Sequence, residues 1–235
     1  MFKKINNIEE GKWLNLKSFL VCLCMVLSFL LVPQIVGSLL YFGRGLNETV
    51  SIIIGNTVLT FLYIIVFFPT LKKQFKDFKT NFSDNFYMSL KYWGIGLALM
   101  LISNFILNFL VFPGEISENE KLNRLFIQSY PLIGFFEIVF LAPFIEELIF
   151  RFGLRKSWGK NKAFPIITAL IFAFLHAIAG ISEVKDLIYL LYIIPYGALG
   201  YAFGYLYNKS DNIYLSITAH MMHNFMTFIL IILFA

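Results

Sequence analysis

The sequence predicts an all-α protein, a polytopic membrane helical bundle, and three observations support that prediction. Of its 235 residues, 59% are hydrophobic and 14% are charged, and the mean hydropathy is +0.75. Soluble domains carry about 25% charged residues, so the composition alone indicates a membrane protein. Phenylalanine occurs 28 times, which suits lipid-facing helices. The third observation is a series of long apolar runs, which we take in chain order.

About seven runs approach the length of roughly 20 apolar residues that a membrane span needs. We treat the chain as one integral membrane domain, with N-terminal helices and a basic segment in 1–130 and a C-terminal helical core in 131–235. The fifth run is short for an independent span. The predicted spans are 18–42, 50–70, 90–112, 131–153, 164–181, 186–207 and 212–234.

Lysine-rich and lysine-poor loops alternate between these runs, as the positive-inside rule predicts. We therefore expect a cytoplasmic N-terminus and an outer C-terminus in a bacterial cell membrane. The net charge of +5 follows from such loops and gives no reason to expect a nucleic-acid partner. The lysine-rich stretches hold Lys3, Lys4, Lys12 and Lys17, then Lys72, Lys73, Lys76 and Lys79, then Arg155, Lys156, Lys160 and Lys162. The lysine-poor loops hold Glu115, Glu118 and Glu120 with Lys121 and Arg124, and Glu183 and Asp186 with Lys185.

The first run reads as a retained span. The polar residues before Ser18 include Glu9 and Glu10, and no small-x-small cleavage site follows them. Cys22 and Cys24 lie two positions apart in this apolar helix and point to different sides. We therefore expect no disulfide between them, and they form neither a zinc motif nor a redox motif.

Residues 71–91 place Phe75, Phe78, Phe82 and Phe86 among lysines at a spacing of three or four. This pattern is typical of a helix lying in the membrane interface, and an ordinary basic loop with aromatic anchors is the alternative. In the sixth run, Gly200 and Gly204 form a G-x-x-x-G pair that predicts close helix packing.

The fourth run, LAPFIEELIFRFG, carries Glu146, Glu147 and Arg151 in an otherwise apolar stretch. An ionisable residue at membrane depth is a functional-site hypothesis, because burying an unpaired charge is costly. Arg151 lies four residues beyond Glu147, so the two can pair on one helix face. Glu146 points about 100° away from Glu147, so it has no partner in its own helix and is the candidate for chemistry. Glu147 with Arg151 reads as a supporting ion pair, and Glu137, on the face opposite Glu146, as an interhelical hydrogen-bonding group.

All three histidines lie in apolar segments of the last third of the chain. His220 and Asn224 are four residues apart and share a helix face, whereas His223 lies at the edge of that face. His176 lies in the preceding IFAFLHA stretch. Counting 1.5 Å per residue from the basic loops puts Glu146, His176, His220 and Asn224 at roughly 12 to 18 Å depth. We expect them to meet in one cavity open to the cytoplasmic side.

A carboxylate, imidazoles and an amide without a nucleophilic hydroxyl or thiol indicate activation of water. Glutamate is suited to general base work, and histidine and asparagine can donate hydrogen bonds to a developing oxyanion. Amide hydrolysis within the membrane fits this set, with no cofactor. Zn²⁺ held by Glu146, His176 and His220 is the alternative, although the sequence has no H-E-x-x-H.

These residues resemble the motifs of the CPBP family, the CAAX proteases and bacteriocin-processing enzymes also called Abi proteins. Glu146, Glu147 and Arg151 match its E-E-x-x-x-R motif, and Phe172 and His176 match F-x-x-x-H. The H-x-x-x-N motif is matched in turn by His220 and Asn224, and the likeness covers about 135–230. Phe152 stands where the family often has the glycine that directly follows the arginine, which puts packing at the end of this helix in doubt.

The resemblance implies an intramembrane endopeptidase of the type II CAAX kind. By that likeness, Glu146 with His176 would activate water, and His220 with Asn224 would stabilise the oxyanion. The expected substrate is a peptide or a lipidated or prenylated protein tail at the bilayer.

Two other functions remain open from the sequence. A bacteriocin self-immunity or scaffold protein of the same fold would not need catalysis, and a Glu146→Gln protein that still protects cells would favour it. A proton-coupled transporter would use the same buried charges, but the two halves of the chain show no repeat of the kind many transporters have.

Overall fold

The computed structural model describes residues 16–234, without the side chains of 179–184. These residues form helices and no strand, which confirms the predicted all-α membrane bundle. The N-terminal lysines and acids before residue 16 lie outside the described residues. The long elements are α2 (Leu16–Arg44), α3 (Glu48–Thr80), α4 (Phe82–Leu110), α5 (Glu118–Ser129), α9 (Phe164–Val184), α10 (Ile193–Ser210) and α11 (Ile213–Phe234), with a short 3₁₀ helix η3 (Leu187–Tyr192) before α10.

A continuous helical run carries the acidic motif and is divided by two π-helical stretches. It comprises α6 (Pro131–Phe136), η1 (Glu137–Leu141), α7 (Ala142–Glu147), η2 (Leu148–Gly153) and α8 (Leu154–Trp158). Single π turns occur mostly within α-helices and frequently at functional sites. The two glutamates therefore sit on a short α-helical piece between two widened turns.

Five of the seven predicted spans coincide with helices long and apolar enough to cross a membrane. These are α2, α3, α4, the unit Leu187–Ser210, and α11. The expected count of seven is not reproduced by length and hydropathy among the described residues. The run 131–153 falls on the divided helix, and the apolar part of α9 is limited to Phe164–Ile178.

Residues 71–91 do not form a separate interfacial helix, and they are not a loop. The non-helical backbone of Asn81 (φ −118°, ψ 46°) ends α3 and starts α4, so the segment consists of two helix ends. Phe78 is buried beside Leu199 and Phe203, whereas the other three phenylalanines are exposed. The short amphipathic helix is α5, which exposes Leu122 and Leu125 while Ile127 is fully buried.

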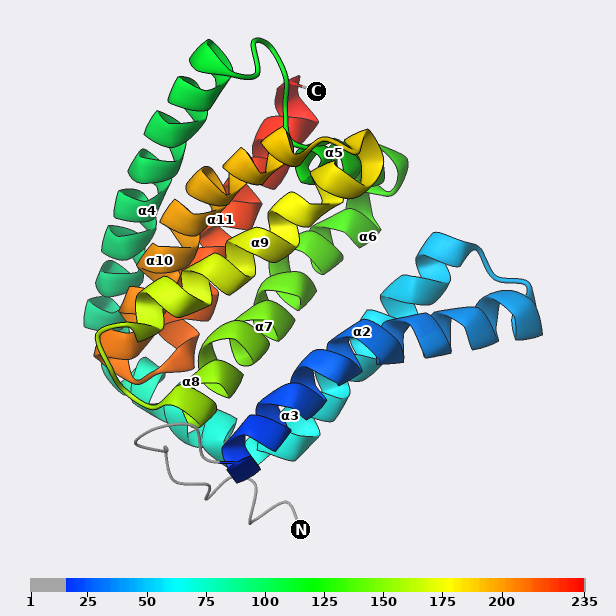
Figure 1. Cartoon of the computed structure of the whole chain (residues 1–235). Helices are drawn as coiled ribbons and strands as arrows, with labels where there is room; N and C mark the ends of the chain where they lie inside the picture. The colour runs from blue at the N-terminus through cyan, green and yellow to red at the C-terminus, as the bar shows by residue number, and fades with distance from the viewer. Residues whose placement is uncertain (1–15, 235) are drawn as a thin grey trace.

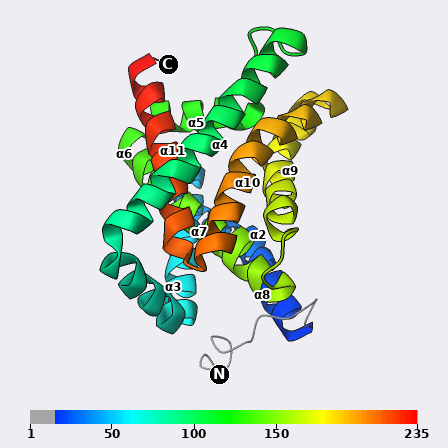
Figure 2. The same cartoon turned by 90° about the vertical axis from the view of Figure 1, so that its left-hand side faces the viewer.

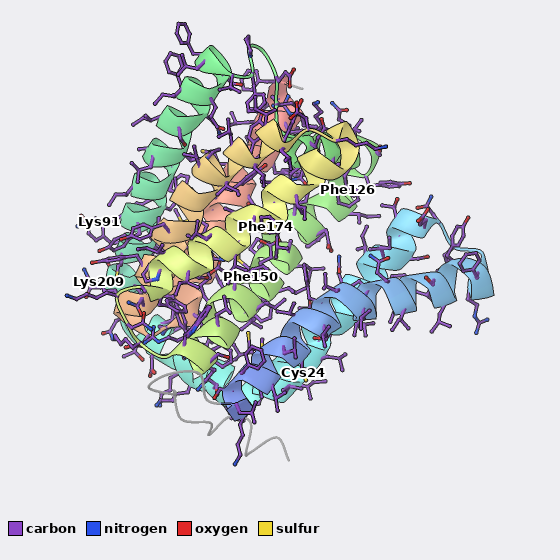
Figure 3. All side chains as sticks on the ribbon, in the orientation of Figure 1. Cys24, Lys91, Phe126, Phe150, Phe174 and Lys209 are labelled. Atoms are coloured by element: carbon purple, nitrogen blue, oxygen red, sulfur yellow. The ribbon has the colours of Figure 1, made fainter. Side chains whose placement is uncertain are left out.

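The molecule has two unlike ends, which Figure 1 and Figure 2 show from two sides. The end of α4, α5 and the C-terminus gather at the upper end, which we call the α5 end. The turns between α3 and α4 and between α8 and α9 lie at the lower end, which we call the lysine-rich end. The side chains drawn in Figure 3 fill the space between the ribbons, and of the two labelled phenylalanines near its centre Phe150 is buried, whereas Phe174 is exposed on α9.

Helix α10 is the central element, packed against α9, α4 and α11. The predicted packing role of its glycines is confirmed, because a Cβ at Gly204 would lie 2.6 Å from Thr168 Cγ2. A Cβ at Gly200 would lie 3.3 Å from the Ala169 backbone. These contacts place α9, which carries His176, directly against α10.

The end of the motif helix packs against α2 and α3. Phe152 is buried, and its ring lies 5.1 Å from that of Phe67, centroid to centroid. A Cβ at Gly153 would lie 3.1 Å from the Met25 sulfur. Cys22 is buried and Cys24 is exposed in α2, both as free thiols, as expected.

Candidate active site

The expected ion pair between Glu147 and Arg151 is present. Arg151 Nη1 lies 3.2 Å from Glu147 Oε1, and both side chains are completely buried. Arg151 Nη2 also donates to the Gly200 carbonyl at 3.2 Å, and the guanidinium lies over the Phe172 ring at 4.6 Å. The arginine thus holds the motif helix against both α9 and α10.

Glu147 has two further partners that the sequence reasoning missed. Ser216 donates its hydroxyl to Glu147 Oε2, and His220 Nδ1 lies 3.0 Å from Glu147 Oε1. Ser216 and His220 are four residues apart, and this spacing on one helix face could have indicated a shared partner. Glu147 is therefore the support of a histidine as well as the counter-ion of an arginine.

Glu146 turns toward the imidazoles, as the sequence predicts. Its Oε2 atom lies 3.9 Å from His176 Nε2 and 3.9 Å from His220 Nε2. The carboxyl comes from α7, and the two rings come from α9 and α11. The two distances are equal, so they do not distinguish the different roles that the sequence predicted for the two histidines.

The hydrogen bonds fix which nitrogen of each ring carries a proton. His176 Nδ1 lies 2.8 Å from the Phe172 carbonyl, which can only accept, so Nδ1 donates. Arg151 and Ser216 favour the carboxylate form of Glu147, so His220 Nδ1 donates as well. In the neutral rings, both Nε2 atoms are then lone-pair acceptors facing Glu146.

Aromatic contacts hold the His176 ring in place. Its centroid lies 4.1 Å from that of Phe172 and 5.2 Å from that of Tyr196. The Tyr196 hydroxyl lies 2.7 Å from Ser117 Oγ, and Ser117 caps the first turn of α5. The α5 helix is thereby connected to a ring that faces Glu146.

The remaining polar residues of the region occupy distinct positions. Asn224 lines the cavity described below, and its Nδ2 donates to the Ile138 carbonyl at 2.8 Å. His223 also lines the cavity, and its buried Nδ1 has no partner within the described part of the chain. Asn56 donates to Glu137 Oε1, so the expected interhelical hydrogen bond of Glu137 is present.

A cavity of about 600 Å³ begins at Glu146, His176 and His220 and runs toward the α5 end. Its outer part is lined by residues 115–124, the end of α4 and the end of α11. The expected opening toward the basic loops is wrong, because no residue of 72–79 or 155–162 lines it. Counting residues along each helix places the four side chains near the middle of the bundle. Such a count does not show at which end of the bundle the helices separate to form the opening.

Two imidazole nitrogens and a carboxylate oxygen are ligands that zinc accepts. Among residues 16–234 with described side chains, however, no group of three or more His, Cys, Asp or Glu has an arrangement that would hold a metal ion. Metal binding by Glu146, His176 and His220 stays an alternative.

Comparison with known proteins bears directly on this region. Residues 128–226 match the family model for type II CAAX prenyl endopeptidases of the Rce1-like kind. This region is Rce1-like. The resemblance to the CPBP proteases is therefore confirmed, and the matched range includes all three motifs.

Two curated relatives extend beyond the Rce1-like region. The chain is 28% identical over 196 residues to the Bacillus subtilis (strain 168) protein named "Putative membrane peptidase YdiL", covering 80% of this chain and 72% of the relative. It is 26% identical over 182 residues to the Lactococcus lactis (strain IL1403) protein named "UPF0177 protein YvdC", covering 72% of this chain and 65% of the relative. No solved structure matches the chain. The comparisons thus support a membrane protease at the family level, and the long apolar helices support an integral membrane protein.

Proposed function

We propose that the protein is an intramembrane endopeptidase that hydrolyses a peptide bond with water activated by Glu146. The observation that carries this proposal is the convergence of three acceptor atoms, Glu146 Oε2 and the two Nε2 atoms, at the inner end of one cavity. Three acceptor atoms with no donor among them suit a molecule that donates hydrogen bonds. Water, which can donate two hydrogen bonds, is the simplest such molecule.

In the proposed reaction, Glu146 takes a proton from this water while the water oxygen attacks the carbonyl carbon of the substrate. His176 Nε2 accepts the second hydrogen bond and orients the water. The carbonyl oxygen becomes an oxyanion, which the Asn224 amide stabilises as a hydrogen-bond donor. The carbon–nitrogen bond then breaks, and the proton held by Glu146 passes to the leaving amine.

His220 is proposed to work through its bond to Glu147. The carboxylate behind Nδ1 holds the orientation of the ring, much as a buried acid orients a catalytic histidine. Once Nε2 has taken a proton from solvent in the cavity, it can donate Nε2–H to the oxyanion beside Asn224. The substrate is proposed to be a peptide or a lipidated protein tail in the bilayer.

The direct test is the Glu146→Gln variant. The amide keeps the shape of the side chain but cannot act as a base, so the cleavage rate should fall by about 10²- to 10⁴-fold. Purified protein in lipid vesicles, or cells that express a tagged candidate substrate, would provide the measurement. Unchanged cleavage by Glu146→Gln would overturn the mechanism, and thermal unfolding of the same variant would show that the fold is retained.

A further inference from the structure

The outer end of the cavity, which we call its mouth, can be placed relative to the membrane from the charges of the molecule. Its outer lining comes from residues 115–124, from Asn104 and Asn108 on α4, and from Leu230 and Phe234 on α11. All of these lie at the α5 end, where Figure 1 shows the C-terminus. The chemistry is thus reached from the end opposite the lysine-rich turns.

The two ends differ strongly in charge. Four lysines lie within residues 72–79, and four more basic residues lie within 155–162. At the α5 end, Glu118 pairs with Lys121 and Glu120 pairs with Arg124, while Glu115 accepts from the Tyr189 hydroxyl. Because loops rich in lysine and arginine stay in the cytoplasm, the mouth faces outward.

Four asparagine side chains line the outer part of the cavity, and they differ in whether their amides have partners. Asn108, with its amide oriented to satisfy both groups, donates to the carbonyls of Phe112 and Glu115. Asn119 contacts the Tyr196 hydroxyl. Within the described part of the chain, Asn104 and Asn123 make no side-chain hydrogen bond, and both line the cavity on different elements.

An amide side chain offers both a donor and an acceptor, as a peptide group does. An extended peptide needs such partners once it leaves water, because an unpaired buried peptide group is costly. The apolar side chains of Leu97, Met100 and Ile231 line the same cavity and suit apolar residues of that peptide.

We infer that the substrate is an extended, apolar peptide segment that enters from the outer face of the membrane, with its main chain bound by Asn104 and Asn123. This inference rests on the proposed function for the cleavage step only. The entry side and the two binding residues follow from the cavity and the loop charges.

The entry side is tested by labelling of single cysteines in intact spheroplasts. In a Cys24→Ser background, whose remaining Cys22 is buried, Asn123→Cys marks the mouth and Lys76→Cys marks the lysine-rich end. A membrane-impermeant maleimide should label Asn123→Cys before lysis and Lys76→Cys only after permeabilisation. Labelling of Lys76→Cys in intact spheroplasts, or failure to label Asn123→Cys there, would overturn outward access.

The binding residues are tested on the uncleaving Glu146→Gln protein in detergent. The probe is a fluorescein-labelled leucine-rich peptide with lysine ends, and binding is followed by fluorescence anisotropy. Asn104→Leu and Asn123→Leu should each raise the Kd by about five-fold, the size of one lost hydrogen bond.

Asn81→Leu is the matched control, because Asn81 is exposed at the lysine-rich end and makes no capping hydrogen bond. An unchanged Kd in both cavity variants, or no binding by the Glu146→Gln parent, would overturn the peptide channel. Neither readout requires cleavage, so failure of the proposed reaction would leave these results intact and would be recognised separately.

Discussion

Glu146 and Glu147 are neighbours in the chain but lie in two different regions of the molecule. Glu147 is completely buried, and Arg151, Ser216 and His220 surround its carboxylate. Glu146 faces the cavity, and within the described part of the chain the polar contacts of its Oε2 atom are two imidazole nitrogens, each at 3.9 Å. Within one helical turn, therefore, one carboxylate is enclosed by partners and the next faces a cavity.

The largest expected effect comes from the packed side. Glu147→Gln leaves the Arg151 guanidinium buried without its counter-ion, and breaking a buried pair in this way costs about 3–5 kcal/mol. We expect a large drop in the unfolding temperature in detergent, whereas Glu146→Gln should unfold close to the parent temperature. Equal stability of the two variants would contradict the division of roles.

On the cavity side, the Asn224→Ala substitution should mainly lower the rate of cleavage. Loss of one oxyanion donor lowers kcat by about 10²- to 10³-fold, and we expect this in a cleavage assay with little change in KM. The side chain also donates to the Ile138 carbonyl, so thermal unfolding must be measured in parallel. A KM increase at constant kcat would instead assign Asn224 to substrate binding.

Ser216→Ala is the intermediate case, because it removes one donor from Glu147 and leaves the arginine in place. Hydrogen bonds to charged groups contribute about 1.5–3 kcal/mol, so we expect that loss of unfolding free energy. Ser216→Thr retains a hydroxyl and is the control. Full stability of Ser216→Ala would show that this bond adds nothing to the support of Glu147.

Glu137→Gln should have the smallest effect. Glu137 is also buried, but the interaction described for it is with the neutral Asn56 rather than with a cation. Glutamine keeps an oxygen that can accept from Asn56, so we expect a change within about 1 kcal/mol and nearly normal cleavage. A loss as large as that of Glu147→Gln would mean that a charge at Glu137 matters to the fold.

Much of the fold and of the candidate cluster was predictable, because both depend on local spacing. Apolar runs predicted the bundle, and the i, i+4 rule predicted the pair of Glu147 and Arg151, which the structure places 3.2 Å apart. The approach of Glu146 to both imidazoles was also expected from its lack of a partner in its own helix. The catalytic roles of these residues stay predictions.

The features that were missed depend on how helices meet. The bond of His220 to Glu147 requires the relative rotation of α7 and α11, which a single sequence does not provide. The direction of the cavity depends on where the helices diverge, and depth along each helix does not report this. The break at Asn81 was missed because the phenylalanines keep their spacing of three or four residues across it, whereas the helical backbone is interrupted there.

The two π-helical stretches that flank α7 have a consequence for how this chain tolerates length changes. Each stretch is a register slip within an otherwise continuous rod, at Glu137–Leu141 and at Leu148–Gly153. Because a π turn takes up one extra residue, removing one residue from either stretch would return that rod to ordinary winding and leave its two flanks facing nearly the same way. A one-residue deletion within either π-helical stretch should therefore be tolerated better than one within α7, which would turn the Glu146 carboxyl by about 100° relative to one flank.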